Sequence, residues 1–169
     1  MDSDVTLVVL TATFGLLGVI VGGVLNGVVT AGLERVQSAR RAQVAARLVQ
    51  DDLTYIKAVM EVEIEEGVWK RLTGNAPPLP FASWADGRDV LAGHLTFKEW
   101  AVASVAARQA LRVVEVAPTN PKPGLPINAN EQANLESMIP DIASGIDVLL
   151  PLSHGKRVPT VWRAILRAS

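Results

Sequence analysis

Three side chains that could bind a cation or move a proton lie close together between residues 86 and 94. Asp86 and Asp89 are three residues apart, so they would share one face of a helix. Such a carboxylate pair can bind a divalent cation. One short helix offers two ligands at most, and the sequence has no second acidic motif with matching spacing. His94 follows Gly93, and we interpret it as a C-terminal helix residue that is favoured by the helix dipole.

The pair Ser153-His154 has the residue types of a nucleophile and its base. Adjacent residues in a turn are expected to point in different directions, and no G-x-S-x-G sequence surrounds the pair. We therefore interpret the segment 154–157 as an exposed basic turn. A glycine-rich phosphate loop is also missing, because the glycines cluster in an apolar segment and do not follow a strand.

The composition narrows the chemistry further. The 169 residues include no cysteine, which excludes disulfides, thiolate metal sites and thiol catalysis. The two histidines are too few for most imidazole-rich metal sites. We predict no enzyme activity, no catalytic residues, no cofactor and no metal. An enzyme with an unrecognised site is the alternative, and a stoichiometric metal or nucleotide in the purified domain would support it.

The elements that would position any site begin with an apolar segment. No charged residue occurs from Val5 to Leu33. A helix of roughly 20 apolar residues crosses a hydrocarbon core of about 30 Å, so this segment is long enough for a transmembrane span. We predict a single-pass membrane protein that is anchored at its N-terminus.

The charges beside the span predict its orientation. The first four residues, Met-Asp-Ser-Asp, contain no basic side chain, unlike a signal peptide. Cleavage after the small residues 30–32 is the less favoured alternative. Positive charge near a span end stays on the cytoplasmic side. We therefore predict a cell-membrane protein with its N-terminus outside and its C-terminal domain in the cytoplasm. The membrane-surface residues would be Arg35, Arg40, Arg41 and Arg47.

Small residues in the span predict contact between helices. Gly18 and Gly22 have the four-residue spacing that lets two backbones approach closely, and Asn26 continues the same stripe. An asparagine at this depth needs a partner, which its copy in a second chain would supply. We predict a homo-oligomer on this face. The alternative is that the glycines have no such role, since small residues are common in spans.

The chain divides by its patterns into three regions: a transmembrane anchor over residues 1–33, a long juxtamembrane helix over residues 34–72, and a helical domain over residues 73–169. In the second region apolar residues recur with helical spacing at Val49, Leu53, Ile56, Met60 and Ile64. The anchor helix is expected to continue into this helix or to be linked to it after a break near Gly32. Six acidic residues against one lysine between residues 51 and 66 indicate a solvated face, or a docking surface for a basic partner.

Helix-capping residues predict the remaining helices. Ser83 would cap a helix from Trp84 to about Gly93, and Thr96 with Glu99 forms a capping box for a helix to about Val116. After an extended loop over Pro118–Pro126, Asn128 or Asn130 would cap a helix from Glu131 to Leu150 that Pro140 kinks or splits. A last short helix is expected from Val158 to Ala168. No segment alternates with period two, so the fold class is all-α: the N-terminal helix followed by a small helical bundle.

The tryptophans are expected to belong to the core. Trp84 and Trp100 would pack on the long helix near Ile56 and Met60. Trp162 lies in a basic segment that would either dock on its own domain or lie at the membrane surface.

Several segments resemble a loose class of small, uncharacterised anchored membrane proteins from high-GC actinobacteria. The resemblance covers residues 5 to 115. It comprises the apolar span, ARLVQDDL at 46–53, GVW at 67–69, Trp84 with RDVLA at 88–92, and LTFKEW at 95–100. It implies a helical cytoplasmic domain and brings no known activity or site.

Taken together, these patterns predict a membrane-anchored helical protein that acts by protein interaction, as a scaffold, adaptor or accessory subunit. Its partners would be the membrane, a second copy and an unknown protein. The net charge of −1 gives no bias toward nucleic acid, so none is expected as a partner. The alternative is a pore-forming or membrane-permeabilising phage-type protein, which measurement of ion leak would reveal.

Overall fold

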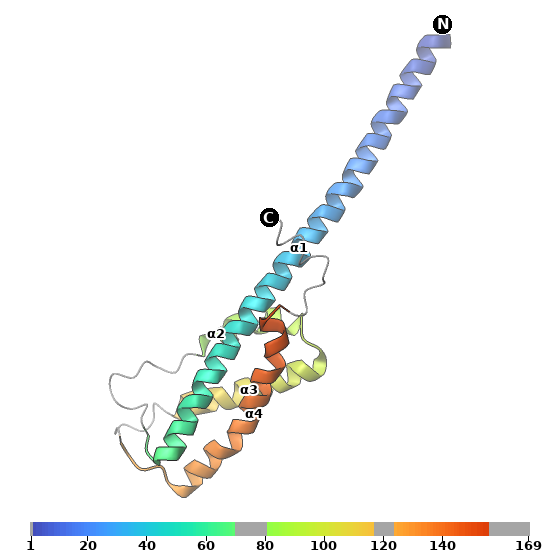
Figure 1. Ribbon diagram of the computed structural model, residues 1–169. Helices are drawn as coiled ribbons and strands as arrows, with labels where there is room; N and C mark the ends of the chain where they lie inside the picture. Colours follow the sequence, from blue (N-terminus) through green and yellow to red (C-terminus); the bar gives the residue numbers. More distant parts are fainter. Residues whose placement is uncertain (1, 70–80, 117–123, 156–169) are drawn as a thin grey trace. The chain divides into compact units, whose positions relative to one another are not determined.

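The structure, a computed structural model, describes residues 2–69, 81–116 and 124–155. These residues form four helices, α1 (Asp2–Glu66), α2 (Ala82–Ala92), α3 (Phe97–Val116) and α4 (Ala129–Ser153) (Figure 1). No strand occurs among them, and the all-α prediction is confirmed. The chain divides into two compact units, Met1–Ser38 and Ala39–Ser169.

Helix α1 is helical through Gly32, so the N-terminal helix continues into the long helix, and the alternative of a break near Gly32 is not observed. It is the one helix in the described part of the chain that is long and apolar enough to cross a membrane. Several of its large apolar side chains in the first unit are more than half exposed, among them Val21, Val24 and Leu33. The helix ends at Glu66, earlier than the predicted Leu72, because Gly67 adopts a φ of 65°, which favours glycine.

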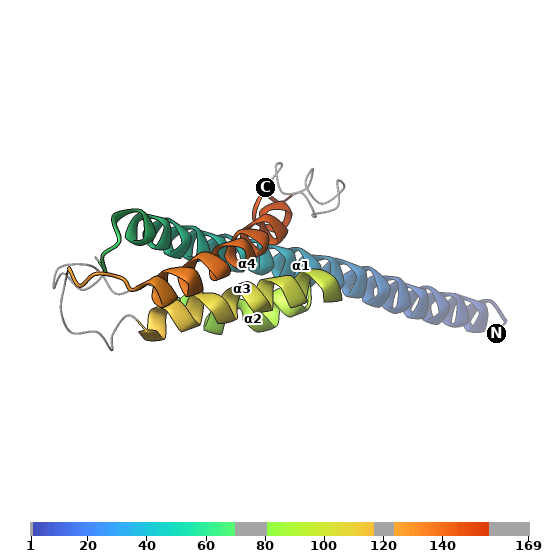
Figure 2. The same ribbon diagram turned by 90° about the horizontal axis from the view of Figure 1, so that it is seen from below.

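In the second unit, neighbouring helices run antiparallel. Helix α2 runs antiparallel to α1. The Ser83 hydroxyl donates to the Asp52 carboxylate, and Gly87, farther along α2, lies against Ala45, which is earlier on α1. Helices α3 and α4 pack along each other (Figure 2). We call the end where α1 enters this unit, at Ala39–Gln43, the proximal end. The opposite end, around Gly67–Trp69, is the distal end.

The core lies on one face of α1. Six of its apolar residues are fully buried with alternating steps of four and three: Ala42, Ala46, Val49, Leu53, Ile56 and Met60. The predicted stripe is thus confirmed from Val49 to Met60, and Ile64 packs against the core while partly exposed. Trp84 and Trp100 also pack against this core and stack on each other, with ring centroids 5.2 Å apart.

Two of the predicted helix caps are observed. The Glu99 amide donates to the Thr96 hydroxyl at 3.4 Å, and the Thr96 amide donates to the Glu99 carboxylate at 2.8 Å. Asn128 and Glu131 make the same reciprocal pair at the start of α4. The prediction that Ser83 caps α2 is wrong. That helix begins after Phe81 without a side-chain cap, and Ser83 lies inside it, where its hydroxyl contacts Asp52.

Helix α4 continues through both of its prolines. Pro140 was expected to kink or split the helix, yet α4 is not split and extends to Ser153, beyond the predicted end at Leu150. A proline inside a helix removes one backbone hydrogen bond and crowds the preceding turn. Tertiary packing supports the helix across this point, since Leu135, Ile142 and Leu149 are all buried in the core. The expected helix from Val158 to Ala168 lies outside the described residues.

A short backbone pairing closes the distal end. The Trp69 amide donates to the Leu125 carbonyl at 3.0 Å, and the Ile127 amide donates to the Gly67 carbonyl at 2.8 Å. These bonds flank an isolated antiparallel bridge between Val68 and Pro126. The residues just after α1 are therefore joined to those just before α4. From the sequence alone, only an extended loop is expected over Pro118–Pro126.

The crossing of α3 and α4 depends on Gly145. A Cβ atom at this residue would lie 2.3 Å from the Cβ atom of Ala106, closer than such atoms pack. Overpacking costs about 1–3 kcal/mol, occasionally more, whereas alanine gains about 1 kcal/mol over glycine inside a helix. We expect Gly145→Ala to lower the melting temperature, measured by tryptophan fluorescence of the full chain in detergent micelles.

The matched control restores the lost space. Combining Gly145→Ala with Ala106→Gly moves the methyl group from α3 to α4, and we expect it to recover part of the lost stability. An unchanged melting temperature for Gly145→Ala alone would mean that the two helices are not this close.

Candidate functional site

The predicted self-association residues lie on the part of α1 that belongs to the first unit. Gly18, Gly22 and Asn26 are all exposed. A Cβ atom at either glycine would meet no other atom within 4 Å. This face is therefore uncovered by the described part of the chain, and its contact with a second copy stays a prediction.

The four predicted membrane-surface arginines are exposed on α1. Arg35 belongs to the first unit, and Arg40, Arg41 and Arg47 belong to the proximal part of the second. None of the four forms an ion pair with another described residue. Their guanidinium groups are therefore available for an external anion.

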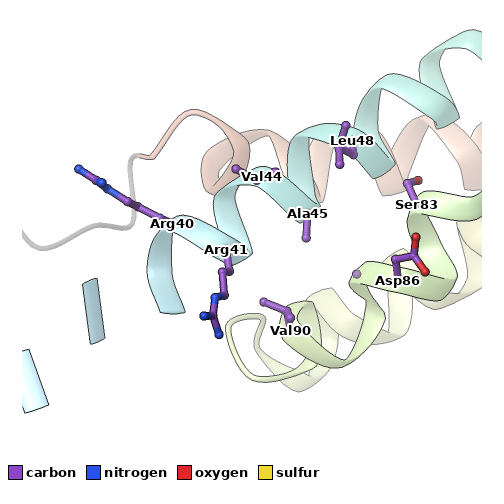
Figure 3. Close-up of a pocket in the computed structure, with 9 residues that line it drawn as sticks. Arg40, Arg41, Val44, Ala45, Leu48, Ser83, Asp86 and Val90 are labelled. Atoms are coloured by element: carbon purple, nitrogen blue, oxygen red, sulfur yellow. The ribbon is translucent and has the colours of Figure 1, made fainter. Parts of the chain in front are cut away.

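A groove of about 420 Å³ lies between α1 and α2, inside the second unit. Figure 3 shows that one wall comes from α1 and the other from α2. The residues that line it are Arg40, Arg41, Val44, Ala45 and Leu48 of α1 and Ser83, Asp86, Gly87 and Val90 of α2. We call this surface the α1–α2 groove.

The groove forms because the two helices cross at small residues. A Cβ atom on Gly87 would lie only 3.1 Å from the Cβ atom of Ala45, so the crossing has no room for larger side chains. The contact between Ser83 and Asp52 fixes the start of α2 on α1. Beside this crossing, no other helix among the described residues covers the larger side chains of α1.

The exposed aliphatic residues are the distinctive part of the groove. Val44 is 58% exposed and Leu48 is 52% exposed, one helical turn apart on α1. Val90 faces them from α2 and is partly buried. Removing apolar surface from water is favourable by roughly 25 cal/mol per Å². A partner that covers these side chains would therefore gain binding free energy.

Charge is distributed unevenly along the groove. The two arginines lie at its proximal end, where Arg41 points toward α2 and Arg40 points away from it (Figure 3). The exposed carboxylate of Asp86 lies on the α2 wall, with Ser83 one turn before it. A molecule bound along the groove would meet cations at one end and an anion farther along.

The acidic pair that could have held a cation does not form a metal cluster. Asp86 and Asp89 are exposed on α2, and an Asp89 carboxylate oxygen lies 3.6 Å from the Arg88 Nε. His94 Nδ1 lies 3.0 Å from the Val90 carbonyl, which can only accept, so this nitrogen donates. Among the described residues, no three His, Asp or Glu side chains are grouped as a metal site requires.

The expectation that Ser153 and His154 point apart is wrong. The Ser153 hydroxyl lies 3.2 Å from His154 Nδ1 and 2.6 Å from Gln50 Oε1. His154 Nδ1 is also 2.9 Å from the Leu150 carbonyl, so it carries a proton and cannot take one from serine. The pair therefore closes the end of α4 and lacks the geometry of a nucleophile with its base.

Sequence reasoning missed the α1–α2 groove. The signal was present, because Val44 and Leu48 are aliphatic residues four apart that lie off the buried stripe of the helix. What the sequence could not supply was the path of α2, which brings Val90 and Asp86 beside them.

The chain was compared with models of protein families, with curated proteins and with solved structures, and no match was found.

Proposed function

We propose that this chain is a single-pass membrane-anchored protein that acts by binding another protein, as a scaffold, adaptor or accessory subunit. The anchor would be the apolar part of α1, with its N-terminus outside and the second unit in the cytoplasm. The four arginines after the span support this orientation, since positive charge stays on the cytoplasmic side.

The observation that carries the proposal is the aliphatic surface of the α1–α2 groove. The core of the bundle packs on the opposite face of α1. Val44 and Leu48 do not belong to that core. Exposed aliphatic residues rimmed by charged groups are typical of surfaces that bind proteins.

The partner chemistry follows from the lining of the groove. An amphipathic helix with aliphatic side chains one turn apart would cover Val44 and Leu48. An acidic residue on that helix would pair with Arg41, and a basic residue would pair with Asp86. The partner would thus be a helical protein segment with a defined order of charges.

Self-association in the membrane would act beside this contact. Gly18, Gly22 and Asn26 offer a small-residue face for a second copy. Because the groove belongs to the second unit and this face to the first, the two contacts can be tested with separate variants.

The experiment is affinity purification of the full chain in mild detergent, with proteins that copurify identified by mass spectrometry. We compare the wild type, the double variant Val44→Ser with Leu48→Ser, and the matched control Val62→Ser, which changes an exposed valine of α1 outside the groove. A partner at fixed stoichiometry should be recovered with the wild type and the control. Its recovery should fall at least about tenfold with the double variant, since removing two buried aliphatic contacts costs more than about 1.4 kcal/mol. Equal recovery with all three proteins, or no partner at all, would contradict the proposal.

A further inference from the structure

Phe97 is an aromatic residue that the bundle does not bury. It is 86% exposed, the highest value of any large apolar side chain in the described residues. The neighbouring Lys98 is also exposed. A single exposed apolar residue is ordinary on a soluble protein, so the surroundings of Phe97 decide what its exposure means.

The turn that carries Phe97 is fixed by a helix cap and by a buried side chain. It is the first residue of α3, directly after the capping box of Thr96 with Glu99. Leu95, two residues earlier, is buried in the core. Because Cα–Cβ bonds tilt toward the N-terminus of a helix, the Phe97 side chain is directed past the start of α3, away from the helix body.

This turn lies at the proximal end of the second unit. Helix α2 returns along α1, so that Gly87 lies against Ala45, and Val90 lines the groove with Arg41. The turn to α3 follows immediately and therefore lies beside the point where α1 enters the unit.

The end of α4 returns to the same place. Gln43 Nε2 donates to the Ser153 carbonyl at 3.2 Å, and the Ser153 hydroxyl donates to Gln50 at 2.6 Å. The sequence that follows, residues 156–169, contains four basic residues and no acidic one.

The acidic groups nearby are few or already engaged. The Glu99 carboxylate accepts from Thr96, and Asp89 lies beside Arg88. Asp86 lies farther along the groove. Arg40, Arg41 and Lys98 have no ion-pair partner among the described residues. The proximal end therefore presents an exposed aromatic side chain with Lys98 next to it in sequence, and the exposed guanidinium groups of Arg40 and Arg41 on α1.

We propose that the proximal end of the second unit binds the surface of an anionic lipid bilayer, with Phe97 inserted at the interface and Lys98 and Arg40 on the phosphate groups. This inference rests on the proposed membrane anchor. Arg40 follows Leu33 by seven residues, at most about 25 Å of extended chain, so head groups are within reach at any angle between the two units. Aromatic and basic residues at one surface are the pattern of interfacial membrane binding.

The test uses the absence of cysteine from the chain. A bimane label is attached to Phe97→Cys in the full-length protein, and the control label is attached to Ala133→Cys, an exposed position near the distal end. Both proteins are reconstituted into vesicles of phosphatidylglycerol with phosphatidylcholine, or of phosphatidylcholine alone, with brominated acyl chains as quencher. We expect quenching at residue 97, much less at residue 133, and a clear dependence on phosphatidylglycerol.

Two variants in the Phe97→Cys background test the contribution of Lys98. Lys98→Gln should reduce the docked population about fivefold, because a basic residue near an anionic surface contributes about this factor. Arg108→Gln, which changes an exposed basic residue farther along α3, is the matched control and should have no effect.

If the protein does not float with the vesicles, the proposed anchor is wrong. If it floats and positions 97 and 133 are quenched equally, only the docking of the proximal end is wrong.

Discussion

Arginine at both Val21 and Val24 should remove the full chain from the membrane fraction. Both valines are exposed on α1 in the first unit, at 54% and 62%. Each arginine near the middle of a span costs about 2.5–3.5 kcal/mol on insertion scales, so the pair costs about 5–7 kcal/mol. Since 1.4 kcal/mol is a factor of ten, insertion should become less favourable by about 10⁴-fold.

The measurement is alkaline carbonate extraction of membranes from cells that express each variant, followed by immunoblotting. The matched control places arginine at Tyr55 and Val62, two exposed α1 residues of the second unit. It adds the same charge and should leave the protein in the pellet. A span variant that also stays in the pellet would show that α1 does not hold this protein in the membrane.

Replacement of Leu53 by alanine should be among the most destabilising single changes in the second unit. Leu53 is fully buried, and its Cδ1 lies 3.5 Å from the position of a Cβ atom on Gly145. Truncation of a buried leucine removes its transfer free energy and leaves a cavity, which together cost about 2–5 kcal/mol. That is a large share of the roughly 5–15 kcal/mol that stabilises an ordinary domain.

Leu48→Ala is the matched control, because it makes the same chemical change five residues earlier on the same helix, at a side chain that is 52% exposed. Thermal unfolding of the full chain in nanodiscs can be followed by fluorescence of the stacked Trp84 and Trp100. We expect a drop of several degrees for Leu53→Ala and a shift near zero for Leu48→Ala. Equal shifts for the two variants would mean that the buried face of α1 is misassigned.

Local chemistry explains which parts of the fold the sequence predicted. The buried stripe from Val49 to Met60 follows from the helical period. The capping box at Thr96 and the cap at Asn128, one of the two candidates in the sequence, need only residues three apart. These features depend on a few neighbouring residues, so no knowledge of the tertiary structure is required.

The failures concern contacts between distant segments. Ser83 resembles a helix cap in sequence, yet its hydroxyl contacts Asp52, which lies 31 residues away. Ser153 bonds Gln50 over 103 residues, and this bond and the bond to Gln43 fix the end of α4. The α1–α2 groove has the same origin, because its two walls come from segments whose pairing no local pattern specifies.

The bond from Gln43 to Ser153 joins residues that are 110 positions apart, near the two ends of the second unit in the sequence. During synthesis the ribosome releases α1 before α4, whose Ile142 and Leu149 complete the core. Contacts over such a separation form only once both segments exist, and apolar surface exposed in the meantime promotes aggregation. The nascent chain thus keeps part of the apolar face of α1 uncovered until α4 has been made. A product that stops before α4 is made would keep that face open, which is the signal that chaperones and proteases recognise.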